Sequence, residues 1–224
     1  MIQFRGATLG PAGAPILTDV NADFPTGHLC AVIGPSGSGK SELLLAAIGV
    51  RRLSAGVVTV NGINPSDAPL LVRSRVCLVA PMAPLPGHRS VLGCARFLSW
   101  LGIGVRPTTR EAVEALRFAE IPDRLMRKPA WTVGLYERFC VWLAVFRLRK
   151  GSILICDDPL AGVSARQSRA AARQMRDIVS AGGSVIVTSR EDWWADHADQ
   201  VFRFESGSIA VQGKQRLEAD LLTS

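Results

Sequence analysis

The segment Gly34-Pro35-Ser36-Gly37-Ser38-Gly39-Lys40-Ser41 constrains the fold of this chain more than any other feature. It matches the phosphate-binding loop (P-loop) pattern G-x-x-x-x-G-K-[ST], which joins a buried strand to a helix. An apolar run at 29–33 precedes it and a run of helix-forming residues at 42–48 follows it, so both flanks agree with the pattern. An ordinary Gly/Ser turn is the alternative, and these flanks disfavour it. The segment predicts a nucleoside triphosphate site.

The residue types of the P-loop suit the chemistry of phosphate binding. Its glycines let backbone N–H groups curl around an anion, and the N-terminus of the following helix adds a favourable dipole. Lys40 is expected to reach the β- and γ-phosphates and so to act in catalysis, while Ser41 is expected to place its hydroxyl on Mg²⁺.

A second candidate site element lies far along the chain. An apolar run at 152–156 predicts a buried strand, and Asp157-Asp158-Pro159 follows it. Asp157 is expected to join the Mg²⁺ shell, and Asp158 to orient or deprotonate an attacking water as a catalytic residue. Asp-Asp-Pro alone is also a common turn, but together with the P-loop it predicts the second half of a Mg-nucleotide site.

Strands and helices alternate along most of the chain. Strands are predicted at 29–33, 56–60, 75–79, 152–156 and 184–188, and helices at 42–48, 137–149 and 165–180. Another helix begins after Thr108, a hydroxyl cap with Glu111 in its first turn. The turn Asn61-Gly62 is expected to lead into a short further strand. This order predicts an α/β fold with a parallel sheet and a nucleotide at the carboxyl ends of its strands.

Composition sets limits on the class of protein. The 224 residues are 48% hydrophobic, which suits one sizeable domain, and the net charge of +7 comes from scattered residues. Few aromatic residues leave little for stacking on bases, so no nucleic-acid partner is expected. The N-terminus is no signal peptide, and no apolar run approaches the length of a membrane span. The mean hydropathy of +0.21 favours a surface covered by a partner.

Two other groups of residues receive a structural interpretation. The cysteines are odd in number and widely spaced, which predicts buried thiols in a reducing cytosol; they are Cys30, Cys77, Cys94, Cys140 and Cys156. The basic patch at 147–150 is expected to be solvated charge at a helix C-terminus, with binding to an anionic lipid surface as the alternative.

In this order the motifs resemble the nucleotide-binding domain of ABC transporters, along essentially the whole chain. The matching segments are the P-loop, the 81–87 lead-in to a helical sub-domain, the 153–164 Walker B and D-loop region, the 185–189 switch strand and the 199–209 hairpin. The resemblance implies a single P-loop NTPase domain over 1–224. Its RecA-like core, with antiparallel strands, would comprise 1–81 and 151–224, and its helical sub-domain about 82–150.

Several positions depart from that family's pattern. No aromatic residue near 9–11 is available to stack on adenine, and the Q-loop glutamine position holds Pro81. The signature motif falls on Val133-Gly134-Leu135-Tyr136-Glu137, which loses the serine and both glycines. The D-loop aspartate position holds Ser164, and the switch histidine position holds Ser189. Neutral drift within an active ATPase is the alternative explanation, which the concentration of changes at the chemistry disfavours.

Two further departures touch the phosphate site itself. Asp158 stands where the family has a catalytic Glu, which shortens the side chain by roughly 1.5 Å. Glu42 stands where the family usually has Thr near the α-phosphate, and completes the nucleotide-contacting set 34–42. Its carboxylate would repel phosphate unless it turns away. These changes predict preserved ATP binding with impaired hydrolysis.

The resemblance implies an ATP-binding subunit of an ABC-type membrane transporter complex. It would bind Mg-ATP, hydrolyse it slowly or with a partner's help, and lie in the cytoplasm on the inner face of the cell membrane. Its partners would be a permease and a second nucleotide-binding domain, in a homodimer or heterodimer. The permease surface would include Pro84-Leu85-Pro86, whereas Phe97 and Trp100 are expected to be mainly sub-domain core.

Two other functional classes stay open at this point. A nucleotide-gated interaction module would bind ATP without hydrolysing it, with the bound state as the signal. A phosphotransferase acting on a small molecule would need an acceptor pocket, for which the sequence offers no separate constellation of residues.

Overall fold

A six-stranded sheet forms the centre of the computed structural model, which describes residues 1–11, 13–205 and 208–213. The strand order is β5-β6-β7-β3-β8-β9, and only β9 is antiparallel to its neighbour. The strands are β3 (Leu29–Ile33), β5 (Val76–Val79), β6 (Ile153–Asp157), β7 (Ser184–Ser189), β8 (Gln200–Glu205) and β9 (Ser208–Gly213). The predicted α/β fold with a parallel sheet is confirmed. Residues 206–207 of the expected 199–209 hairpin lie outside the described residues.

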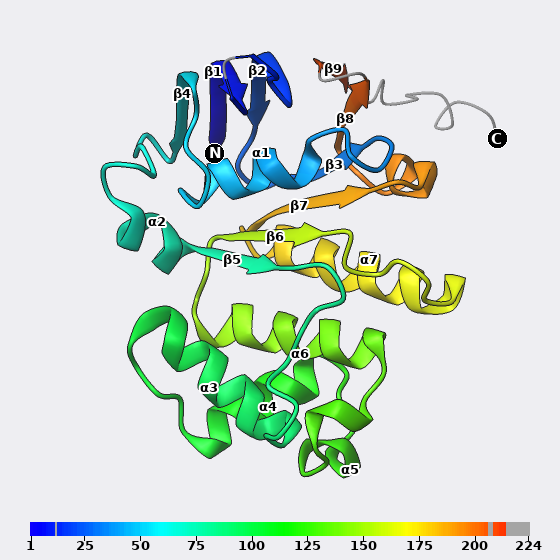
Figure 1. The fold of residues 1–224 in the computed structure, drawn as a ribbon. Coiled ribbons are helices and arrows are strands. Elements are labelled where there is room, and N and C mark those ends of the chain that lie inside the picture. The colour runs from blue at the N-terminus through cyan, green and yellow to red at the C-terminus, as the bar shows by residue number, and fades with distance from the viewer. Residues whose placement is uncertain (12, 206–207, 214–224) are drawn as a thin grey trace, which may run out of the picture.

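A second, antiparallel sheet lies beside the first (Figure 1). Its order is β2-β1-β4, from β1 (Ile2–Leu9), β2 (Leu17–Phe24) and β4 (Ala55–Val60). Helix α1 (Lys40–Ala47) lies between the two sheets, and one hydrophobic cluster joins all three. Within that cluster the rings of Phe24 and Phe202 lie 4.2 Å apart, so burial of aromatic surface fixes one sheet on the other.

The chain after β4 differs from expectation. The Asn61-Gly62 turn leads only to an isolated bridge between Val60 and Ile63, and helix α2 (Pro69–Arg75) replaces the expected short strand. The intervening residues 64–69 contain Asn, Asp and two prolines, which disfavour a strand, and Pro69 is well placed at the start of a helix.

Four helices lie on the far side of the large sheet from α1 (Figure 1). They are α3 (Val91–Ile103), α4 (Thr109–Phe118), α5 (Asp123–Met126) and α6 (Leu135–Leu148), while α7 (Ala165–Ser180) covers the sheet itself. Thr108 and Glu111 form the capping box of α4, as the sequence predicts. The long α6 supplies much of the second core cluster, including Phe139 and Val145.

Three expectations about individual side chains have different outcomes. All five cysteines are free and buried, as predicted. Arg149 is only partly solvated, because its guanidinium donates to the backbone carbonyls of Arg73 and Val76. Trp100 is 44% exposed rather than core, since it lies on the open face of α3, and Phe97 is half-buried beneath the guanidinium of Arg89. No helix in the described part of the chain is long and apolar enough to cross a membrane.

Candidate nucleotide-binding site

The register of three neighbouring strands brings the candidate site residues to one edge of the sheet. Val32 on β3, Thr188 on β7 and Asp157 on β6 lie in one row across the sheet. The P-loop leaves β3 two residues later, where the N–H of Gly34 donates to the carbonyl of Ser189 at 3.2 Å. Segments that are more than 100 residues apart in the sequence therefore meet at the carboxyl ends of the strands.

The P-loop backbone needs glycine at its tight positions. Gly37 and Gly39 have φ angles of 79° and 96°, which side chains other than glycine adopt at a cost. A Cβ on Gly39 would lie 2.6 Å from the side chain of Leu17, so the loop is also packed closely against β2. No atom lies within 4 Å of the Cβ position of Gly37, which leaves that face of the loop open to a ligand.

Lys40 begins α1 and is folded back over the loop. Its ammonium donates to the carbonyls of Gly34 and Pro35 at 2.8 and 2.7 Å. Burial lowers the pKa of Lys40, and the negative charges of Asp158 and Asp157 oppose that shift. The cation thus lies between the loop and the two carboxylates, where it can reach a bound phosphate.

The start of α1 is open to an anion. No side chain caps the helix at Gly39, and the first-turn N–H groups of a helix have no partner within it. Ser41 is exposed at this point. The Glu42 carboxylate pairs with the Arg51 guanidinium at 2.8 Å, so its charge is neutralised by a residue beyond the other end of α1. Glu42 is therefore not free to repel a phosphate.

Thr188 organises the acidic end of β6. Its hydroxyl donates to Oδ1 of the buried Asp157 at 2.7 Å and accepts the backbone N–H of Asp158 at 2.9 Å. Asp158 has a φ of 41°, a left-handed conformation that Asp tolerates better than most residues. Sequence reasoning assigned no role to Thr188, and the only signal available was its place at the end of a predicted strand.

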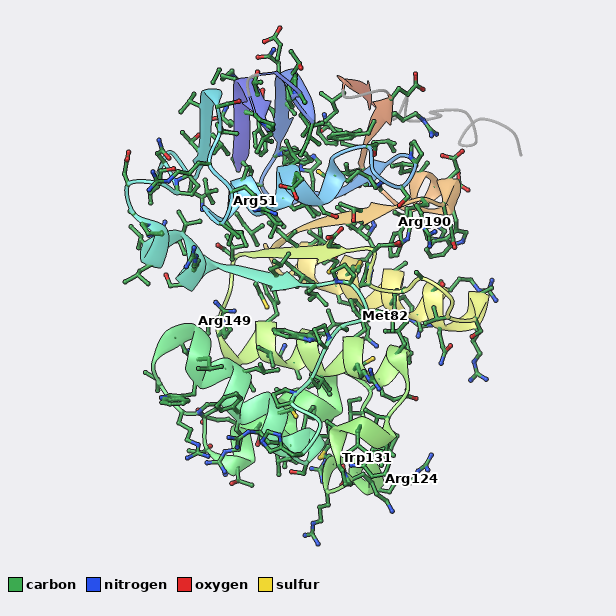
Figure 2. The ribbon with its side chains drawn as sticks, in the orientation of Figure 1. Arg51, Met82, Arg124, Trp131, Arg149 and Arg190 are labelled. Carbon is green, nitrogen blue, oxygen red and sulfur yellow. The ribbon has the colours of Figure 1, made fainter. Side chains whose placement is uncertain are left out.

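Arg190, which the sequence patterns also missed, faces the Asp158 carboxylate. Its Nε lies 3.3 Å from Oδ2 of Asp158, and Figure 2 places it at the carboxyl ends of the strands. The positive charge of Arg190 contributes to the lowered pKa of Lys40. The site therefore contains two cations and two carboxylates before any ligand is considered.

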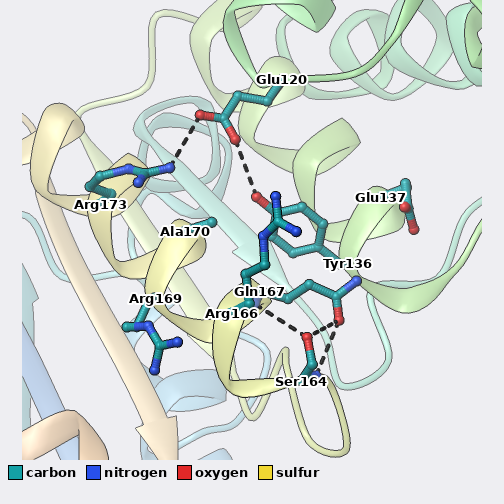
Figure 3. A pocket seen from close by; sticks show the side chains of 9 residues that line it. All are labelled: Glu120, Tyr136, Glu137, Ser164, Arg166, Gln167, Arg169, Ala170 and Arg173. Carbon is teal, nitrogen blue, oxygen red and sulfur yellow. Dashed lines mark hydrogen bonds and ion pairs between the residues drawn. The ribbon is translucent and has the colours of Figure 1, made fainter.

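The residues at the signature position make contacts within the fold. Gly134 caps α6 in an extended conformation, and Tyr136 points toward α7. The Tyr136 hydroxyl accepts a hydrogen bond from Gln174 at 3.2 Å. It also lies 3.5 Å from a carboxylate oxygen of Glu120 (Figure 3). Its phenol is therefore held against α7 rather than left free for a phosphate.

The residues at the D-loop and Q-loop positions also take part in local structure. Ser164, at the D-loop aspartate position, forms the capping box of α7 with Gln167, a role that aspartate can also fill at a helix start. At the Q-loop position, the chain after Pro81 turns sharply through Met82 and Ala83, whose φ angles are 64° and 42°. Met82 is 63% exposed there.

A metal ion at this site would need ligands beyond the protein. In the ranges described, no group of three or more His, Cys, Asp or Glu side chains is placed to hold a metal ion. A Mg²⁺ shell built from one carboxylate, one hydroxyl, phosphate oxygens and water needs no such group. The oxygen donors of Asp157 and Ser41 fit that kind of site.

Comparisons with known proteins agree with this geometry. The family model described as ABC transporter matches residues 17–161. The hemin import ATP-binding protein HmuV of Streptomyces coelicolor is 32% identical over 208 residues, covering 90% of this chain and 73% of that protein. The Fe(3+) ions import ATP-binding protein FbpC of the same organism is 29% identical over 220 residues, covering 95% of this chain and 62% of that protein.

A solved structure supports the fold. An ATP-binding cassette, solved as a dimer in a post-hydrolysis state bound to ADP and Pi, has a TM-score of 0.84 at 17% identity. The match covers 95% of this chain and 98% of that one. With a family model that spans well over half of its residues, this chain belongs to the ABC transporter family, as one of its ATP-binding domains.

Proposed function

We propose that this chain is the ATP-binding subunit of an ABC-type membrane transporter, with slow or partner-dependent hydrolysis. The observation that carries the proposal is the meeting of Lys40, Asp157 and Asp158 at one edge of the sheet, through the hydrogen bonds of Gly34 and Thr188. The names of the two relatives describe import, which favours an import system for this chain as well.

Residues 34–42 would hold the triphosphate. Backbone N–H groups of the loop and of the α1 N-terminus would donate to phosphate oxygens, and Lys40 would exchange its carbonyl partners for the β- and γ-phosphates. Ser41 and Asp157 would hold Mg²⁺, which supplies charge neutralisation and orientation of the phosphates. The hydrogen bond from Thr188 fixes the Asp157 carboxylate for that role.

Slow hydrolysis follows from the state of the residues around the terminal phosphate. Asp158 is the catalytic candidate, yet its side chain is one methylene shorter than that of the glutamate usual in the family. Ser189 and Pro81 offer no imidazole or amide that could position a water. A complete catalytic site would therefore need residues from a second domain.

We further propose the assembly and the division of the chain. The core would comprise 1–81 and 151–224 and the helical sub-domain about 82–150, with a second nucleotide-binding domain facing the P-loop. A permease would contact the surface near Pro84-Leu85-Pro86. The carbonyls of Pro84 and Pro86 accept hydrogen bonds from Trp142 and Cys94, which hold this stretch against the helices. The complex would lie at the inner face of the cell membrane.

The first test is ATP binding by the purified chain. We expect Lys40→Ala to weaken Mg-ATP binding roughly tenfold or more, because a charge-assisted contact to phosphate is lost. Lys128→Ala, a change at an exposed lysine distant from the P-loop in the sequence, should leave affinity unchanged. Calorimetric titration measures both. Equal affinities of the wild-type chain and Lys40→Ala would contradict the proposed site.

A nucleotide-gated module that binds ATP without hydrolysing it is the second candidate. The altered positions around Asp158 favour it, because Ser189 and Pro81 offer no imidazole or amide that could position a water. Clear ATP binding with no steady hydrolysis by the complete assembly would support this candidate over the transporter ATPase.

A further inference from the structure

Arg190 lies beside the phosphate site, directly after the strand β7 that neighbours the P-loop strand β3. Gly34 lies between Lys40 and the residue that precedes Arg190. Its N–H donates to the carbonyl of Ser189, and its own carbonyl accepts a hydrogen bond from the Lys40 ammonium. Arg190 directly follows Ser189, so it emerges from the sheet next to the first residue of the P-loop. On its other side it pairs with Asp158.

The pair between Arg190 and Asp158 is suited to exchange. Its N–O distance is 3.3 Å, and the two side chains are 58% and 30% exposed. Exposed ion pairs of this kind contribute little stability, because water and salt screen them and both side chains lose freedom. A stronger anion arriving at the site can therefore take the guanidinium without a large cost to the fold.

The negative charges of the site and of a bound triphosphate together favour a second cation beside Lys40. A triphosphate bound to the P-loop would place its terminal phosphate near Asp157 and Asp158, which carry the same sign of charge. Mg²⁺ and Lys40 offset part of that repulsion. A guanidinium is planar, stays charged, and offers paired donors that match phosphate oxygens.

We propose that Arg190 binds the terminal phosphate of ATP, exchanging Asp158 for that phosphate. The proposal rests on the proposed function, in which Asp158 faces the terminal phosphate. Bound ATP then frees the Asp158 carboxylate, whereas ADP, which lacks that phosphate, leaves the pair in place. Arg190 thus makes the site distinguish ATP from ADP, and couples the triphosphate to release of the carboxylate that would handle water.

The test compares the affinities of Mg-ATP and Mg-ADP for the full chain by calorimetric titration. Arg190→Ala is expected to weaken ATP binding roughly 5- to 20-fold and to change ADP binding less than about twofold. Arg190→Lys keeps the positive charge and loses the paired N–H donors of the guanidinium. It should therefore recover part of the ATP affinity that Arg190→Ala loses. Arg124→Ala, at an exposed arginine at the far end of the helices (Figure 2), should change neither affinity.

A double-mutant cycle separates direct binding from an effect through Asp158. In the Asp158→Asn background, Arg190→Ala should still weaken ATP binding if the guanidinium touches the phosphate. A complete loss of its effect in that background would make Arg190 a partner of Asp158 only, and would overturn the proposal. An unchanged ratio of ATP to ADP affinity in Arg190→Ala would overturn it as well.

The outcomes also distinguish this inference from the proposed function. If the wild-type chain does not bind ATP, or if Lys40→Ala binds as well as wild type, the nucleotide site itself is wrong. If Lys40→Ala fails to bind while Arg190→Ala keeps the wild-type ratio, only the role of Arg190 fails. Thermal unfolding of each variant checks the fold, which the exposed Arg190 side chain should not affect.

Discussion

At the scale of single residues, Thr188 is the side chain that holds Asp157 and the backbone of Asp158 in place. We expect Thr188→Val to lower the free energy of unfolding by about 1–3 kcal/mol, because the buried Asp157 loses a donor and the N–H of Asp158 keeps only the backbone carbonyl of residue 188 as an acceptor. The same change should weaken Mg-ATP binding, since the carboxylate is no longer oriented. Urea unfolding and calorimetric titration measure the two effects.

Thr188→Ser is the matched control, because it keeps the hydroxyl and removes only a methyl group. It should retain most of the affinity for Mg-ATP. A Val variant that binds as tightly as the Ser variant would mean that the hydrogen bond does not orient Asp157.

Local sequence patterns indicated the candidate residues that directly follow a recognisable strand. They missed the residues whose place in the site depends on the order of strands in the sheet. The P-loop and Asp157 each follow a recognisable strand, so their positions could be read from neighbouring residues. Thr188 and Arg190 act only because β7 lies between β3 and β6, an order that no local pattern contains. Likewise, the pairing of Glu42 depends on how the chain turns after α1.

At the scale of elements, Arg149 joins the end of α6 to the start of β5. Its guanidinium donates to the carbonyls of Arg73 and Val76, and a Cβ on Gly102 would lie 2.2 Å from its Nε, so α3 packs against it too. The basic pattern at 147–150 indicated solvated charge because periodicity cannot reveal carbonyls from a distant helix end. One of the two nearby arginines is structural, and the sequence does not say which.

Removal of this link should loosen the attachment of the helices. We expect Arg149→Ala to lower the free energy of unfolding by about 1–3 kcal/mol, because the partly buried carbonyl of Val76 and the exposed carbonyl of Arg73 lose a charged donor and a gap opens against α3. Arg147→Ala is the control, since its guanidinium lies over the Phe118 ring 3.9 Å from the centroid and should contribute about 0.5–1 kcal/mol. Urea unfolding of both variants decides the matter, and equal losses would count against the link.

At the scale of the whole molecule, the P-loop lies between β3 and α1, beside the altered positions Asp158 and Ser189, whereas the altered signature and D-loop positions lie at the starts of α6 and α7. The P-loop half is complete within one chain, whereas the signature position is closed by Tyr136 and the D-loop position is used by Ser164 as a helix cap. We therefore expect a single chain to bind nucleotide, and its turnover to depend on what a second domain supplies. The overall α/β order was predictable from alternating patterns, but this division of labour required the packing of α6 on α7.

The altered residues beside the P-loop predict which substitutions would raise the rate of ATP hydrolysis. We expect Asp158→Glu with Ser189→His to increase ATP hydrolysis at least about tenfold in the complete assembly, because a misplacement of about 1 Å at a reacting centre can cost roughly 100-fold. The longer carboxylate would reach further toward the attacking water, and the imidazole would offer a proton-accepting or donating group at the end of β7. Phosphate release under saturating Mg-ATP is the measurement, and adding Lys40→Ala should abolish the gain. An unchanged rate would place the limitation at Pro81, Tyr136 and Ser164, whose roles in the fold resist any simple reversal.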